Sequence, residues 1–213
     1  YGGPDWYVSV DGSDSLNVGS ESSPFATIQK GISSAAEGDT IFVGAGTYFE
    51  HVNVYAGRVL ISQDGRENTI IDGSGEGRVM DITREATIDG FTIRNGFLYN
   101  GNGAGLYLNS YQGKTILRNL IIEDNVCGSG NGSGNGGGIY IDAYGNPWDS
   151  DFDIPIDEPM VEMSHCIIRS NEVSSDWQDY NGIGGGAYIV TNHLIKFNNC
   201  EFTNNFAGKN GGG

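Results

Sequence analysis

The sequence predicts an all-β solenoid, in which short strands stack coil upon coil. The first observation behind this prediction is a sequence motif that occurs four times within residues 86–213. Each copy has an apolar strand ending in polar residues, then glycines and a second strand. The apolar strands are FTIRN at 91–95, LIIEDN at 120–125, CIIRSN at 166–171 and CEFTNN at 200–205. The glycine segments are GAGLYL at 103–108, GGGIYI at 136–141, GGGAYI at 184–189 and GGG at 211–213. Such repeats are typical of solenoids, in which each coil contacts only its neighbours.

The second observation is the unequal spacing of the copies, which favours parallel coils over an antiparallel sandwich. Phe91 and Leu120 are 29 residues apart, Leu120 and Cys166 are 46 apart, and Cys166 and Cys200 are 34 apart. A solenoid accommodates such differences as loops at one corner, because a coil needs only to meet its neighbours in register. We expect one domain over residues 1–213, with an N-terminal strand and cap at 1–40, first coils at 41–85, repeats at 86–213, and insertions at 142–160 and 174–182.

A single helix is predicted, over residues 25–36. Phe25, Ile28, Ile32 and Ala35 fall on one helical face, and Pro24 precedes them. We expect this helix to cap the N-terminal end of the core, where strand edges would otherwise be open. Strands are predicted at 6–10, 40–43, 52–54, 59–61, 69–71 and 79–82, with a turn at 44–48.

The composition excludes several classes of partner. The chain has 213 residues, of which 35 are glycine, and 11 basic against 27 acidic residues give a net charge of −16. This charge opposes binding to nucleic acid and to anionic membranes. It also opposes direct binding of polyuronates, unless a cation such as Ca²⁺ bridges the two. No run of about 18 apolar residues occurs, so no membrane span is predicted.

Several motifs carry a resemblance to known families. YVSVDGSD at 7–14, PFATIQ at 24–29, GDTI at 38–41 and GTY at 46–48 resemble the N-terminal part of secreted right-handed parallel β-helix proteins of the pectate-lyase-like superfamily. GGGAYI at 184–189 and FTNN at 202–205 look like the surface repeats of polymorphic outer-membrane proteins. The resemblance implies a right-handed parallel β-helix that is secreted or at a bacterial cell surface. It does not fix an activity, because this scaffold carries lyases, hydrolases, adhesins and fibres.

Alignment of the four copies predicts ladders of equivalent side chains. Three ladders are apolar: Ile88, Leu117, Met163 and Phe197; Phe91, Leu120, Cys166 and Cys200; and Ile93, Ile122, Ile168 and Phe202. Two are polar: a turn position with Gly90, Asn119, His165 and Asn199, and a second ladder with Asn125, Asn171 and Asn205. Asparagine at such positions can bond backbone groups that have no strand partner. We therefore interpret His165 as a substitute in a structural ladder rather than as a catalytic base.

Cysteine is rare, and no metal-binding spacing of Cys or His occurs. The three cysteines are Cys127, Cys166 and Cys200. Adjacent coils lie roughly 4.8 Å apart, which would permit a disulfide between Cys166 and Cys200. Buried free thiols are the favoured interpretation.

One outward-facing column could carry lyase chemistry. It contains Arg94, Glu123, Arg169 and Thr203, and beside it, on the same strands, we expect Asp89, Arg118, Ser164 and Asn198. A polysaccharide lyase of the resembling fold uses Lys or Arg as the base beside acids that hold Ca²⁺ against the substrate carboxylate. Arg118 or Arg169 with Asp89 and Glu123 are the candidates. The alternative is a set of simple ion pairs between coils, each contributing about 0–1 kcal/mol.

The two insertions suggest ligand sites. Asp149, Asp151 and Asp153 place oxygen ligands at alternate positions, which suits Ca²⁺, although an EF-hand-type loop would have glycine where Ile154 stands. An acidic solvated loop is the alternative. Both insertions carry aromatic residues beside acids, and we expect both to leave the same repeat edge. One sugar-binding patch is therefore predicted from Tyr144, Trp148, Trp177 and Tyr180.

Two functional classes remain open from the sequence. The first is a non-catalytic secreted or cell-surface module for adhesion, glycan binding or a fibre, and it is favoured because no base–metal constellation stands out. The second is a polysaccharide lyase or a glycoside hydrolase, although no carboxylate pair is flanked by aromatic platforms. The glycines at 211–213 precede no strand. We therefore expect either a longer parent chain or self-association through an open C-terminal coil.

Overall fold

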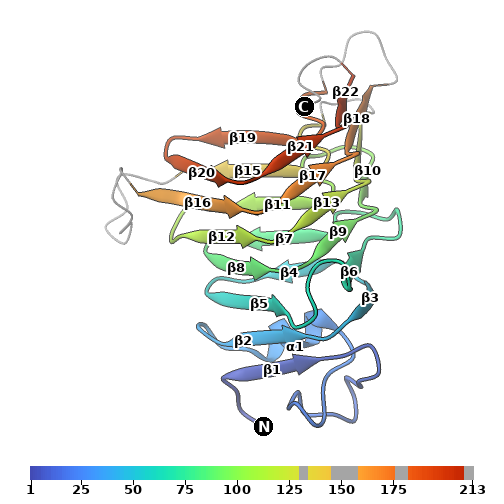
Figure 1. Ribbon diagram of the computed structural model, residues 1–213, viewed down its shortest axis with the longest axis vertical. Coiled ribbons are helices and arrows are strands. Elements are labelled where there is room, and N and C mark those ends of the chain that lie inside the picture. The colour runs from blue at the N-terminus through green and yellow to red at the C-terminus, as the bar shows by residue number, and fades with distance from the viewer. Residues whose placement is uncertain (130–133, 145–157, 176–181, 209–213) are drawn as a thin grey trace.

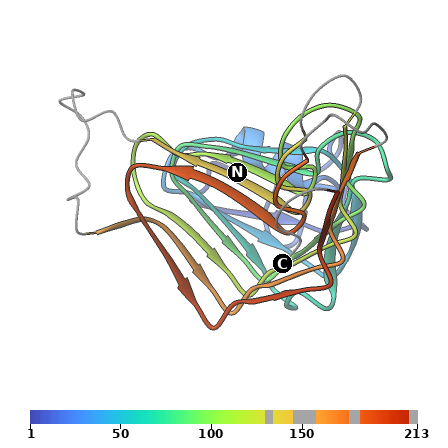
Figure 2. The ribbon, with the colours of Figure 1, turned by 90° about the horizontal axis from the view of Figure 1, so that it is seen from above.

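The protein is a right-handed parallel β-helix, as a computed structural model shows (Figure 1). The structure describes residues 1–129, 134–144, 158–175 and 182–208. Its coils stack along the long axis from β1 at one end to β22 at the other. Seen along the stack, successive coils follow similar outlines (Figure 2). All strand pairs are parallel and join residues one coil apart, as the repeated sequence motif predicted.

The strands form four sheets, and the later coils pass through them in the order first, second, fourth and third. The first sheet contains β1 (Asp5–Val8), β2 (Thr40–Val43), β5 (Arg58–Ser62), β8 (Ala86–Asp89), β12 (Thr115–Arg118), β16 (Pro159–Ser164) and β20 (Leu194–Asn198). The second sheet contains β3 (Gly46–Phe49), β6 (Thr69–Asp72), β9 (Thr92–Arg94), β13 (Ile121–Glu123), β17 (Ile167–Arg169) and β21 (Glu201–Thr203). The fourth sheet contains β10 (Phe97–Leu98), β14 (Val126–Ser129), β18 (Glu172–Ser175) and β22 (Phe206–Ala207). The third sheet, which closes each coil, contains β4 (Val52–Val54), β7 (Met80–Thr83), β11 (Leu106–Asn109), β15 (Ile139–Ala143) and β19 (Ala187–Thr191).

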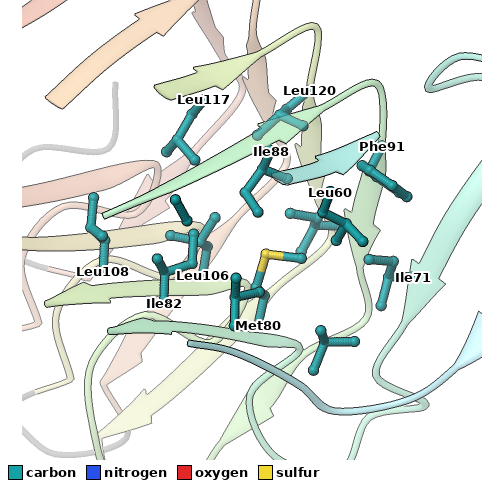
Figure 3. Packing of buried hydrophobic residues seen from close by; sticks show 14 of the residues in the cluster. Leu60, Ile71, Met80, Ile82, Ile88, Phe91, Leu106, Leu108, Leu117 and Leu120 are labelled. Carbon is teal, nitrogen blue, oxygen red and sulfur yellow. The ribbon is translucent and has the colours of Figure 1, made fainter. Parts of the chain in front are cut away.

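The interior is built from the predicted apolar ladders, although Phe197 in the last coil is 38 % exposed. Leu117 pairs in register with Ile88 on one side and Met163 on the other, and Met163 pairs with Phe197. Figure 3 shows Ile88 and Leu117 of the first sheet facing the same interior as Leu108 of the third sheet. The alternation of buried and less buried residues along the strands follows the period of two of a pleated strand, so each coil presents one apolar face inward.

The predicted turn ladder is confirmed. Gly90, Asn119, His165 and Asn199 all have a left-handed backbone, with φ of 86°, 54°, 54° and 50°. Glycine and asparagine adopt this conformation at low cost. A second left-handed position follows the second sheet, at Asn95, Asp124, Ser170 and Asn204. Each left-handed residue turns the chain from one sheet into the next.

The predicted capping helix is present but shorter than expected. It runs over Ile28–Ser34 (α1), because Thr27 is extended with φ −117° and its side chain caps the helix by accepting from the Lys30 N–H. Asp14 accepts hydrogen bonds from the N–H groups of Ala26 and Thr27, which holds that segment outside the helix. Ile28 and Ile32 are fully buried, so the helix closes the core at the N-terminal end.

The expected turn over residues 44–48 is wrong for most of its length. Gly46–Phe49 is strand β3, and it pairs in parallel with β6. Tyr48 is buried in the core and donates from its hydroxyl to the Gly44 carbonyl oxygen. Only residues 44–45 turn the chain, since pairing with the next coil overrides the turn preference of a glycine-rich segment.

The three cysteines are free thiols, as favoured from the sequence. Cys127 and Cys166 are fully buried, and Cys200 is half-buried. Burial raises the pKa of Cys127 to about 11 and that of Cys166 to about 12. These side chains therefore act as small apolar residues of the interior.

Candidate functional site

The second and fourth sheets meet at a corner where the surface is hollowed. A cavity of about 550 Å³ opens there, hereafter the corner pocket. Residues from several coils form its lining, including Phe49, Asp72, Asn95, Phe97, Asp124 and Val126. Asn95 and Asp124 occupy the left-handed positions of two successive coils. The stacking of coils thus brings together residues that are far apart in the sequence.

Two phenylalanines in the corner pocket are unusually exposed for aromatic residues. Phe49 is 71 % exposed, and Phe97 is 41 % exposed. Phe49 is the last residue of β3, and Phe97 is the first residue of β10. The backbone N–H of Phe97 donates a hydrogen bond to the carbonyl oxygen of Gly77. Exposed rings beside polar groups are typical of ligand sites, because a ring offers an apolar face while the neighbours orient the ligand.

Asp72 supplies a buried, ionised carboxylate to the corner pocket. Its Oδ2 accepts from Arg94 Nε and from Asn95 Nδ2, both at 2.8 Å, and its Oδ1 accepts from the Ser74 N–H at 2.9 Å. Burial alone would raise the pKa of Asp72. The hydrogen bonds from Ser74, Arg94 and Asn95 and the charge of Arg94 outweigh burial and lower this pKa below its usual value.

Asp124 has the opposite environment. Desolvation and then the negative charge of Glu123 raise the pKa of Asp124, although Arg169 and Arg94 oppose this shift. Within the described ranges, the Asp124 carboxylate accepts no hydrogen bond and joins no ion pair. Of the two acids in the corner pocket, Asp124 is therefore the one available to a ligand.

The candidate lyase residues form two ion pairs between adjacent coils. Arg118 Nε lies 2.8 Å from Asp89 Oδ2, and an Arg169 guanidinium nitrogen lies 2.7 Å from Glu123 Oε2. The expectation that both pairs share the same strands is wrong, because Asp89 and Arg118 belong to the first sheet and Glu123 and Arg169 to the second. The left-handed residue Asn119 separates the two sheets.

The ion pair of Arg169 affects its ability to act as a catalytic base. The hydrogen bond that Arg169 donates to Glu123, followed by the negative charge of Glu123, raises the pKa of Arg169 above its already high usual value. A base must instead lose its proton readily. The catalytic role remains a prediction, and it would require the ion pair to open.

His165 stands where the ladder predicts. It has φ 54°, and its Nε2 lies 3.2 Å from Nδ2 of Asn199 in the next coil. Its carbonyl oxygen accepts from the Arg66 guanidinium at 2.7 Å. The contacts of His165 are thus those of a turn residue held between coils.

The predicted aromatic patch and calcium site lie mostly outside the described residues. These positions are Trp148, Asp149, Asp151, Asp153, Trp177 and Tyr180. Tyr144 is described; it follows β15 and is 54 % exposed. Among the residues with described positions, no group of three or more His, Cys, Asp or Glu side chains could hold a metal ion.

The expectation that both insertions leave one edge is wrong. The segment after Ala143 connects β15 of the third sheet to β16 of the first sheet. The segment after Ser175 instead connects β18 of the fourth sheet to Gly182 and β19 of the third sheet. The sequence itself indicates this difference. The first insertion comes after the strand that follows the glycines at 136–138, whereas the second insertion comes before the glycines at 184–186 and their strand.

The corner pocket was not predicted from the sequence. One signal could have pointed to Asp124: in the aligned copies its position holds Asn95, Ser170 and Asn204, so it alone carries a charge. Phe49 lies before the repeats begin, and no ladder marks it. Its place beside Phe97 follows only from the stacking of coils.

The fold and this pocket define the class of protein: a right-handed parallel β-helix with an aromatic and acidic cavity at one corner. A family model described as "Protein of unknown function (DUF1565)" matches residues 10–54, from just after β1 to the end of β4. No curated protein matches the chain. Among solved structures it is similar to a protein named "Rhamnogalacturonan lyase", with 15 % identity and a TM-score of 0.44. That likeness covers 99 % of this chain but 63 % of the other, so the chain spans under two thirds of its length.

No helix in the described ranges has the length and apolar character needed to cross a membrane.

Proposed function

We propose that this chain is a secreted or cell-surface β-helix module that binds an extracellular polysaccharide in the corner pocket. The observation that carries the proposal is the exposure of Phe49 and Phe97 beside the carboxylate of Asp124. A pyranose ring has an apolar face of C–H groups and a rim of hydroxyls. Aromatic rings cover the first, and carboxylate and amide groups bond the second.

The shape and setting of the corner pocket support this proposal. The pocket is open to solvent, and it lies where the second and fourth sheets meet. A polymer can therefore enter from the side without threading an end. The extracellular setting is supported by the resemblance of the N-terminal motifs to secreted β-helix proteins.

A binding panel tests this function. The protein is titrated calorimetrically with soluble neutral polysaccharides and polyuronates, with and without Ca²⁺. We expect binding of at least one glycan and a loss of about tenfold or more in affinity when Phe49 and Phe97 are both changed to Ala. Tyr55→Ala is the matched control, because Tyr55 is 49 % exposed and does not line the corner pocket. Equal losses in both variants would contradict a site at this corner.

Hydrolysis of the bound glycan is a second candidate, and one observation favours it. Asp72 and Asp124 line the same pocket, and their pKa values are displaced in opposite directions. Such a pair is the arrangement of a general acid with an ionised partner. The three hydrogen bonds on Asp72 oppose this role. New reducing ends, released by the unchanged protein and not by Asp124→Asn, would establish hydrolysis, and unsaturated products would indicate a lyase.

A further inference from the structure

We infer that Asp124 makes the corner pocket selective for glycans that carry no carboxylate groups. On this inference the pocket binds neutral sugars and excludes polyuronates. It rests on the proposed function, that the corner pocket binds a glycan, and it names the class of glycan.

The charged groups in the lining of the corner pocket have one sign. Among the described residues, the lining includes the carboxyl groups of Asp72 and Asp124 and no Arg, Lys or His side chain. Glu123 precedes Asp124 and also acts on it as a negative charge, although Glu123 is itself paired with Arg169. A uronate placed against Phe49 and Phe97 would therefore meet like charges.

The arginines nearest to the corner pocket are engaged elsewhere. Arg94 Nε bonds Asp72 at 2.8 Å, and the Asp72 side chain is 5 % exposed. Turning Arg94 toward a uronate would leave a buried carboxylate without its counter-charge, which is strongly unfavourable. Arg169 is paired with Glu123 at 2.7 Å, in a more exposed ion pair. Both cations are therefore already paired with acids of this chain.

Asp124 is the residue through which this discrimination acts. Its carboxylate has no partner within the described part of the chain, whereas Asp72 already accepts hydrogen bonds from three donors. A sugar hydroxyl can donate to the Asp124 carboxylate. A sugar carboxylate has no proton to donate and repels it at contact distance. One residue can thus both bind a neutral sugar and reject an acidic one.

The repeats supply a clean variant for the test. Asp124 has φ 54°, and asparagine stands at the equivalent left-handed positions Asn95 and Asn204. Asp124→Asn therefore keeps the shape and suits the backbone while it removes the charge. Glu21→Gln, at an exposed site near the N-terminus, changes the net charge by the same unit and is the control.

The experiment uses two matched pairs of polymers: polygalacturonate with its fully methyl-esterified form, and polyglucuronate with its methyl ester. Affinities are measured by calorimetry at neutral pH, at fixed ionic strength and with a chelator that prevents bridging by cations. We expect the ester of at least one pair to bind about tenfold or more tightly than the acid. Asp124→Asn should bring the two affinities within about threefold, mainly by improving the acid form, whereas Glu21→Gln should leave the ratio unchanged.

Each other outcome decides against the inference. Equal or tighter binding of the acid form overturns the inference and leaves glycan binding intact. An unchanged ratio in Asp124→Asn, with the ester preferred, removes the role of Asp124. Binding of no polymer in these pairs or in the neutral panel overturns the proposed function and the inference with it.

Discussion

Asn171 Oδ1 accepts two hydrogen bonds from Asn125, one from its backbone N–H at 3.1 Å and one from its Nδ2 at 3.0 Å. The pattern repeats one coil later, where Asn205 Oδ1 accepts from the same two groups of Asn171 at 3.1 and 3.0 Å. Asn125 and Asn171 are fully buried. The ladder therefore satisfies backbone groups at a corner that no strand pairing reaches, and it fixes the register of neighbouring coils.

We predict that Asn171→Ala lowers the free energy of unfolding by about 3 kcal/mol, because it leaves the buried backbone N–H of Asn125 without an acceptor and removes the hydrogen bonds that Asn171 Nδ2 donates to Ile122 and Asn205. The measurement is the midpoint of urea unfolding followed by circular dichroism. Asn100→Ala, at an exposed position, is the control and should change stability by no more than about 0.5 kcal/mol. Similar effects of the two substitutions would show that the ladder does not stabilise the fold.

The lowered pKa of Asp72 predicts a loss of stability in acid. Because the folded pKa lies below the unfolded value of about 3.9, the contribution is complete above that pH and is lost as pH falls through the folded pKa. Asp72→Asn should lower stability at neutral pH by about 2 kcal/mol and flatten the decline of the melting temperature in acid. A variant whose acid profile matches that of the unchanged protein would contradict this assignment.

The thiols are predicted to differ in reactivity. Burial keeps Cys127 and Cys166 protonated at neutral pH, since it raises their pKa to about 11 and about 12, and only Cys200 is half-buried. A colorimetric thiol reagent should therefore label no more than one cysteine promptly in the native protein and all three after denaturation. Cys200→Ala should abolish the prompt reaction. Prompt labelling of two or more thiols would be inconsistent with the buried positions.

Close approach of coils makes Gly138 intolerant of a side chain. A Cβ at this position would lie 2.6 Å from the Gly186 carbonyl oxygen and 2.8 Å from Asn171 Cγ. We expect Gly138→Ala to lower the free energy of unfolding by about 2 kcal/mol, in the range of overpacking substitutions. Gly2→Ala is the control, because nothing lies within 4 Å of its added carbon. A neutral Gly138→Ala in urea unfolding would mean that the coils can separate locally without cost.

The ion pairs of Arg118 and Arg169 should matter little to stability. Both arginine side chains are nearly half exposed, at 45 % and 44 %, and exposed pairs contribute about 0–1 kcal/mol. The free energies of unfolding of Arg118→Ala and Arg169→Ala should therefore differ from that of the unchanged protein by no more than about 1 kcal/mol. The same variants are incubated with polyuronates in the presence of Ca²⁺. Turnover by the unchanged protein that either variant loses would instead establish the lyase role considered from the sequence.

The repeated sequence motif was sufficient to predict the register between adjacent coils. Ile122 pairs with Ile93 and Ile168, as the alignment of the copies requires, and Asn119 and His165 adopt the same turn. This prediction succeeds because a solenoid contact joins equivalent positions of adjacent copies, so a comparison of the copies is a comparison of spatial neighbours. The same reasoning was weaker before residue 86, where no copy existed to reveal strand β3.

The corner pocket was decided by the tertiary structure. Phe49, Asp72 and Phe97 come from different coils, and no periodicity links them in the sequence. The proximity of these three residues depends on the number of residues in the loops of each coil and on the angle between the second and fourth sheets. The sequence by itself determined the parallel β-helix, its apolar ladders and its asparagine ladder, because these follow from local repetition. The structure alone determined which side chains share the pocket, because that depends on coil length and on contacts between residues that do not repeat.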